Sequence, residues 1–183
     1  MNDIAIYTIG YGNRKWADFL ELLKQYQIKY LIDIRSIPYS RYNTQYNQSI
    51  LKILLEKNNI NYVYMGSELG GRPNDEKCYV NGLVDYEIVK NKAFYLKGIE
   101  RLKTAYEKKL KIALMCSEIN PCECHRSKLI GCTLHSFGIN VLHIDENGQL
   151  KTQTQVLHTI NKGNFEYNLF GETIHLTSRK KYT

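Results

Sequence analysis

Groups that bind anions, attack electrophiles or move protons crowd one short segment near the middle of the chain. They are Cys116, Glu118, Cys124, His125 and Arg126. The segment follows an apolar run at residues 112–115, which predicts a buried strand. It precedes apolar residues at helical spacing that end at Gly138. A strand-to-helix loop of this kind is where open α/β sheets carry their ligand sites, and these groups suit nucleophilic catalysis with proton transfer.

Cys116 is the candidate nucleophile or redox thiol. It ends the predicted strand, lies before a helix N-terminus and has arginines nearby, and these neighbours favour a thiolate. We therefore expect a lowered Cys116 pKa, with Glu118 or His125 acting as acid and base. The alternative is that Cys116 is a small buried residue at the strand end, because free cysteine is among the most buried residue types.

The same cysteines allow two other kinds of site. Cys116, Cys124 and His125 are ligand types that suit zinc, but the spacing lacks the usual Cys-x-x-Cys pairs. Adjacent Cys124 and His125 also do not readily face one ion. We predict no metal and no cofactor, with zinc kept as the alternative. Oxidation to a disulfide between Cys116 and either Cys124 or Cys122 is the other alternative.

Three arginines are candidates for holding an anionic substrate. Arg126 opens the predicted helix, where free backbone N–H groups and the helix dipole attract an anion such as phosphate or carboxylate. Arg35 and Arg41 follow the second predicted strand and would complete the clamp. Alternatively, Arg35 pairs with Asp33 or Glu118 and only orders its loop.

Glycine-rich turns and a histidine complete the candidate set. Gly10 follows the first predicted strand, and Gly70 and Gly71 follow the third, so all three are candidates for substrate binding. They match neither a dinucleotide-binding motif nor a P-loop. His143 ends a strand and could act as an acid, base or ligand, with a structural role as the alternative. The tyrosines beside the arginines that could stack on bases are Tyr39, Tyr42 and Tyr46.

Alternating strands and helices position these residues. The predicted strands are residues 4–8, 30–34, 62–65, 112–115 and 140–144, with an edge strand at 173–177 and a flexible flap at 74–86. This alternation predicts a single α/β domain with a mostly parallel sheet of about five strands and helices on both faces, a Rossmann-like three-layer fold. Since parallel strands share one direction, the loops that carry the candidate residues converge on one crevice.

Length and charge limit the class of protein. We expect an α/β domain over residues 1–150 of the 183, with a C-terminal extension at 151–183 that packs on it and frays at its end. No run of about 18 apolar residues occurs and the N-terminus lacks a signal-peptide pattern, so we expect a cytoplasmic protein without membrane contact. The net charge of +7 favours an anionic small molecule or a nucleic acid as partner, although part of it lies in a basic tail at 179–181.

These residues together resemble the family catalogued as domain of unknown function four-eight-eight. The resemblance rests on Thr8-Ile9-Gly10, Asp33-Ile34-Arg35, Pro38, Ser40-Arg41, Leu69-Gly70-Gly71, Cys116-Ser117-Glu118, Cys124-His125-Arg126 and His143-Ile144. The chain departs from it at Tyr11 and Gly12, where the family commonly has histidine and serine, and Cys78, Cys122 and Cys132 lie outside the pattern. The resemblance implies a compact α/β domain with these residues around one pocket, and it implies no established activity.

The sequence thus predicts an enzyme that acts on an anionic substrate, a nucleotide or nucleic acid. In this prediction Cys116, Glu118, His125 and His143 do the chemistry, while the arginines hold the anion. The alternatives are a nucleic-acid-binding module without catalysis, whose affinity would fall steeply with salt, and a thiol or metal sensor. The sequence predicts no particular oligomeric state.

Overall fold

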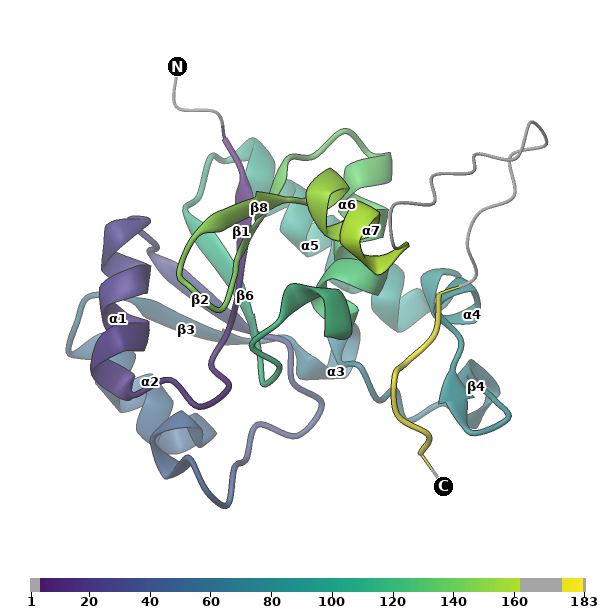
Figure 1. The fold of residues 1–183 in the computed structure, drawn as a ribbon, viewed down its shortest axis with the longest axis horizontal. Coiled ribbons are helices and arrows are strands. Elements are labelled where there is room, and N and C mark those ends of the chain that lie inside the picture. The colour runs from purple at the N-terminus through teal and green to yellow at the C-terminus, as the bar shows by residue number, and fades with distance from the viewer. Residues whose placement is uncertain (1–3, 162–175, 183) are drawn as a thin grey trace.

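A six-stranded sheet runs through the centre of the computed structural model, which describes residues 4–161 and 176–182 (Figure 1). The strand order is β3-β2-β6-β1-β7-β8, and β8 alone of these six is antiparallel to its neighbour. The strands are β1 (Ile6–Gly10), β2 (Tyr30–Asp33), β3 (Asn61–Tyr64), β6 (Ile112–Cys116), β7 (Val141–Ile144) and β8 (Leu150–Thr152). The prediction of a mostly parallel α/β sheet is confirmed.

The helices cover the two faces of the sheet (Figure 1). The longer ones are α1 (Trp16–Gln25), α2 (Gln48–Glu56), α5 (Ala93–Glu107) and α7 (Gln153–Ile160). Short turns of helix are η1 (Thr44–Tyr46), α3 (Gly66–Leu69), η2 (Glu76–Cys78), α4 (Tyr86–Lys90), η3 (Pro121–Glu123), η4 (Arg126–Gly131) and α6 (Cys132–Ser136). Among the described residues no helix is both long and apolar enough to cross a membrane.

Alternation along each central strand sends side chains to two separate apolar cores. Ala113 and Met115 of β6 join one core, with Phe19 and Leu23 of α1 and with α2. The strand's other residues, Leu114 among them, join the second core with α5, η4 and α6. Because β6 is buried on both faces, its sequence is a continuous apolar run rather than an alternation, as parallel strands require.

The chain reverses its direction across the sheet at β6. From β1 through β2 to β3 the strands progress toward one edge, whereas β6 and β7 return toward the other. Right-handed crossovers therefore put α1 and α2 on one face and α5, η4 and α6 on the opposite face. The carboxyl ends of β1, β2 and β6 flank this reversal, which is the position at which open α/β sheets bind ligands.

The C-terminal segment, residues 176–182, lies beside a small hairpin of β4 (Tyr79–Val80) and β5 (Leu83–Val84) (Figure 1). Its Ser178 and Tyr182 backbone N–H groups bond to the carbonyls of Val84 and Gly82. The hairpin occupies the part of the chain without apolar period, since two-residue strands are too short to produce one. Of the edge strand predicted at 173–177, residues 173–175 lie outside the described residues, and Thr177 forms an isolated bridge with Asp85.

Candidate functional site

Two buried cysteines and a glutamate form a compact cluster at the carboxyl end of β6. Cys116 is the last residue of β6 and is 1% exposed, and its Sγ lies 2.9 Å from Sγ of Cys124. The Cys124 thiol also donates a hydrogen bond to the Glu118 carboxylate, at 3.3 Å. These three side chains, predicted separately from the sequence, are therefore in mutual contact.

The loop that brings Cys124 back to β6 is fixed by local hydrogen bonds. Asn120 caps the short helix η3 by accepting from the Cys122 N–H at 2.9 Å, and Pro121 occupies the first turn, where no N–H is needed. After the loop, the Ser127 hydroxyl donates to the carbonyls of Pro121 and Cys124. Backbone and side-chain bonds thus hold Cys124 opposite Cys116.

The fully buried guanidinium of Arg126 binds the backbone of the same loop. Its Nη1 lies 3.2 Å from Cys116 Sγ and donates to the Glu118 carbonyl at 2.9 Å, and Nη2 donates to the Ile119 carbonyl at 2.8 Å. Gly10 makes this possible, since a Cβ there would lie 1.8 Å from that Glu118 oxygen and 2.5 Å from Nη1. The predicted roles of Gly10 and Arg126 in anion binding remain predictions. Their contacts here are to protein atoms.

The electrostatics of the cluster keep the thiol protonated and the carboxylate charged. Burial raises the pKa of the Cys116 thiol well above its ordinary value. A hydrogen bond with Cys124 adds to this, and Arg126 offsets only part of it. Burial also pushes the pKa of Glu118 upward, but the charge of His125 and hydrogen bonds to the carboxylate bring it below its ordinary value. The expected lowering of the Cys116 pKa is therefore wrong, because the strand end is fully desolvated.

His125 stands beside the cluster and faces a cleft. Its Nδ1 lies 3.5 Å from Cys124 Sγ, while its Nε2 is buried and has no hydrogen-bond partner among the described residues. Gly71 leaves room for the imidazole, because a Cβ at this position would lie 2.9 Å from Nδ1. Gly70 is similarly enclosed, by the Gly66 carbonyl and the Ser36 hydroxyl.

A cleft of about 330 Å³ opens directly over Cys116 and Glu118. Its walls come from the loops after β1, β2 and β6, from the turn after α3 and from the C-terminal segment. The lining side chains include Tyr11, Arg35, Ile37, Tyr39, Arg72, His125, Lys180 and Tyr182. A volume of this size suits a small molecule.

Arg35 lines this cleft and is held by Asp33. The Arg35 Nε and Nη2 donate to the two Asp33 carboxylate oxygens at 2.8 and 2.6 Å, and Nη2 also reaches the Tyr46 carbonyl at 2.7 Å. Tyr62 donates to Asp33 as well, at 2.8 Å. Although burial opposes the charge, the bonds to Asp33 raise the pKa of Arg35 above its ordinary value. The pairing of Arg35 with Asp33, raised from the sequence as an alternative, is present.

Arg41 and His143 are not brought to the cleft. Arg41 is exposed on the loop after β2 and is not among the residues that line it. His143 is fully buried between β1 and α7, with its Nδ1 2.7 Å from the Thr8 hydroxyl and its Nε2 2.7 Å from Gln153 Oε1. Burial lowers the pKa of His143 to about 4, so the imidazole is neutral near pH 7.

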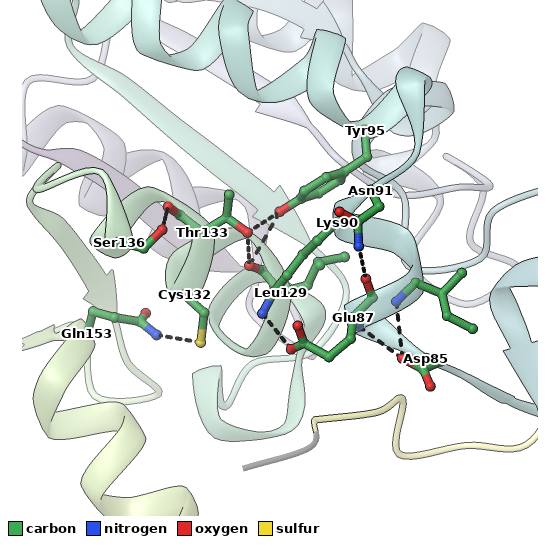
Figure 2. Close-up of polar contacts among 11 residues, drawn as sticks. Asp85, Glu87, Lys90, Asn91, Tyr95, Leu129, Cys132, Thr133, Ser136 and Gln153 are labelled. Carbon is green, nitrogen blue, oxygen red and sulfur yellow. Dashed lines mark hydrogen bonds and ion pairs between the residues drawn. The ribbon is translucent and has the colours of Figure 1, made fainter. Parts of the chain in front are cut away.

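The His143 network anchors the helix that carries Arg126. Gln153 donates from Nε2 to the Ser127 carbonyl at 3.1 Å. The same Nε2 lies 3.5 Å from Cys132 Sγ (Figure 2). On the other side, the Tyr95 hydroxyl of α5 contacts Thr133 Oγ1 at 2.8 Å (Figure 2). The turn η4 between them is a π-helix, a form found often at functional sites.

The cluster has donors for a metal, but its charges disfavour one. Among the described residues, one ligand atom each from Cys116, Glu118 and Cys124 lie within 4.8 Å of one another, a donor set that suits zinc. The Arg126 guanidinium lies 3.2 Å from Cys116 Sγ, and its backbone N–H donates to Cys124 Sγ. A divalent cation between these sulfurs would meet that positive charge at close range.

Lys180 is a cleft residue that sequence reasoning missed, and Arg72 was not singled out from the glycine-rich turn that holds Gly70 and Gly71. Arg72 directly follows Gly71, so its place after a candidate turn was an available signal. Lys180 belongs to the basic tail, whose charge gave no positional information.

The family model described as Domain of unknown function DUF488 matches residues 15–132, more than half of the chain. The chain therefore belongs to this family, and the predicted family is confirmed. Comparisons with curated proteins and with solved structures found no match. The C-terminal segment that lines the cleft lies outside the matched residues.

The thiol pair predicts a specific oxidation product. A disulfide requires about 2.05 Å between sulfurs, so Cys116 and Cys124 need only a small approach from 2.9 Å. Treatment with diamide should give one intramolecular disulfide joining these two residues, identified by peptide mass mapping without reduction. Cys122→Ser should retain this product. A disulfide that joins Cys122 to either residue instead would contradict the geometry.

The buried His143 predicts a loss of stability in acid. Since the folded-state pKa is about 4 and the unfolded value about 6.5, only the unfolded chain gains this proton as pH falls between them. The contribution of His143 to the free energy of unfolding is therefore intact above pH 6.5, and it falls by on the order of 3 kcal/mol as the pH drops toward 4. Urea unfolding of His143→Gln should show a shallower pH dependence than the wild type. His135→Gln, at an exposed position, should keep the wild-type slope, and equal slopes for all three proteins would refute the assignment.

Proposed function

We propose that this member of the DUF488 family is an enzyme in which the Cys116 sulfur attacks an electrophilic atom of a small anionic substrate and displaces a leaving group, while Glu118 accepts the thiol proton. The observation that carries the proposal is the contact of two thiols with a charged carboxylate beneath a cleft. Buried thiols that only fill a core do not need such a partner. A nucleophile beside a positioned base is the usual arrangement for covalent catalysis.

The proton of Cys116 has a short path to Glu118. The two sulfurs lie 2.9 Å apart and the second, on Cys124, lies 3.3 Å from the Glu118 carboxylate. Without a bound anion this proton transfer is unfavourable, because the pKa of Cys116 is raised and the pKa of Glu118 is lowered. An anion bound in the cleft raises the pKa of Glu118 by like-charge repulsion, which makes it a better proton acceptor when substrate is present.

Two further groups support the developing charges. The Arg126 Nη1, 3.2 Å from Cys116 Sγ, stabilises the thiolate as it forms. The unpaired Nε2 of His125 faces the same region and can exchange a proton with the leaving group. His143 acts in this proposal through Gln153 and Ser127, by holding the loop in place.

A thiol sensor is the second candidate, and the sulfur-to-sulfur distance supports it. In that role the Cys116–Cys124 pair would oxidise reversibly, and the cleft would admit the oxidant. The two candidates differ in the role of Glu118. The enzyme needs this carboxylate as a base when substrate is bound, whereas a sensor needs no such base.

Alkylation with charged and neutral reagents tests the proposed enzyme. Iodoacetate is an anionic electrophile and iodoacetamide its neutral counterpart, so a thiol beneath a cationic cleft should prefer iodoacetate. We expect Cys116 to show this preference by peptide mass mapping. Glu118→Gln should slow its modification at least tenfold, because the proton acceptor is lost. Glu107→Gln removes an exposed carboxylate at the end of α5, away from the cleft, and should leave the rate at Cys116 unchanged.

Two results would exclude this function. Modification of Cys122 and Cys132 with none at Cys116 would show that the cleft does not give access to the thiol. A Glu118→Gln rate equal to that of wild type would remove the base. Cys116→Ser should change the free energy of unfolding by less than about 2 kcal/mol, and unfolding of this variant would make Cys116 structural.

A further inference from the structure

Two cations on the cleft wall have no acidic partner in the part of the chain that the structure describes. Arg72 stacks on the Tyr182 ring at 4.1 Å, and Lys180 extends from the same C-terminal segment. Of the other charged groups at the cleft, Arg35 is paired with Asp33, and the negative charge of Glu118 is offset within the cluster by the Arg126 guanidinium, which bonds to the Glu118 backbone carbonyl. The cleft therefore carries an excess of two positive charges.

Arg35 adds an independent sign of a missing ligand. The Arg35 side chain is only 5% exposed, and Asp33 and the Tyr46 carbonyl occupy its Nε and Nη2. Its Nη1 is buried and has no hydrogen-bond partner within residues 4–161 and 176–182. Buried guanidinium groups seldom leave a nitrogen unpaired, and an acceptor on a ligand in the cleft would satisfy it.

We propose that Arg72, Lys180 and Nη1 of Arg35 bind the phosphate of a small phosphate monoester. A monoester carries about −1.5 to −2 charges near pH 7, which matches the uncompensated pair, whereas each diester of a nucleic acid backbone carries only one. Planar guanidinium groups pair well with phosphate oxygens, and the lysine adds a point charge. The site deepens the proposed function, on which it rests for the placement of substrate above Cys116.

The opposite end of the ligand is an apolar planar ring. Ile37 and Tyr39 lie on the cleft wall and are 63% and 66% exposed, so both present apolar surface that the described part of the chain leaves uncovered. Tyr11 is not available, because its ring stacks on Tyr46 at 4.2 Å. A base that stacks on Tyr39 would bury this surface, and phosphate and ring together describe a nucleoside monophosphate.

The size of the cleft favours a single nucleotide over a nucleic acid strand. About 330 Å³ is at the lower end of the range for small-molecule sites. Lys180 and Tyr182 come from the C-terminal segment, beyond the residues that match the family model. The preference for a phosphate monoester is therefore set partly by chain outside the matched region.

Titration calorimetry of the full-length, reduced Cys116→Ser protein tests the site without chemistry. The probes are AMP, adenosine, inorganic phosphate and a single-stranded oligonucleotide without terminal phosphate. We expect AMP to bind more tightly than adenosine or phosphate, and Arg72→Ala and Lys180→Ala each to weaken AMP at least tenfold. Arg41→Ala and Lys181→Ala remove the same charges outside the cleft and should change affinity less than twofold. Tyr39→Ala should weaken AMP and leave phosphate unchanged.

Equal losses from the cleft and control variants would overturn the site, as would adenosine binding as tightly as AMP. Tighter binding of the oligonucleotide would identify a nucleic-acid surface instead. Arg72 also packs on Tyr182, so its removal could prevent folding. If the Arg72→Ala protein is unfolded, the affinity of Lys180→Ala for AMP tests the site. AMP binding without modification of Cys116 by iodoacetate would support this site and exclude the proposed enzyme. Modification of Cys116 without AMP binding would support the enzyme and exclude this site.

Discussion

The site depends on one buried cation, the guanidinium of Arg126. It ties the carbonyls of Glu118 and Ile119 to the end of β6 and lies 3.2 Å from Cys116 Sγ. A buried charge without partners would be strongly destabilising, so the loop must fold around it to supply them. Gly10 on the neighbouring strand is then required, because any side chain would occupy the same space.

In this cluster the charged groups are not the group that is proposed to react. Glu118 and Arg126 hold the two formal charges of the cluster, while Cys116 stays neutral in a dry environment. A buried neutral thiol reacts slowly with reagents that do not bind in the cleft, since the thiolate is the reactive form. In the proposed enzyme, the negative charge of the bound substrate raises the pKa of Glu118, and this favours transfer of the Cys116 proton to it.

The sequence was sufficient for the five parallel strands and for Cys116, Glu118 and His125 at their edge, but it did not predict the antiparallel strand β8. Continuous apolar runs such as Ile112–Met115 mark buried parallel strands, and parallel strands bring their following loops together, which placed Cys116, Glu118 and His125 in one site. The sign of the Cys116 pKa shift was wrong because desolvation depends on packing by distant elements. Lys180 could not be found from sequence, since its position depends on contacts between residues 176–182 and the β4–β5 hairpin.

The most direct measurement is the ionisation of Cys116 itself. The ultraviolet absorbance of thiolate, recorded against pH for the wild type and for Cys116→Ser, isolates this one group by difference. We predict that the difference signal is absent at pH 7 and rises only above pH 9, as burial of the thiol requires. A thiolate signal already present at or below pH 7 would contradict the account, because Cys116 would then need no base.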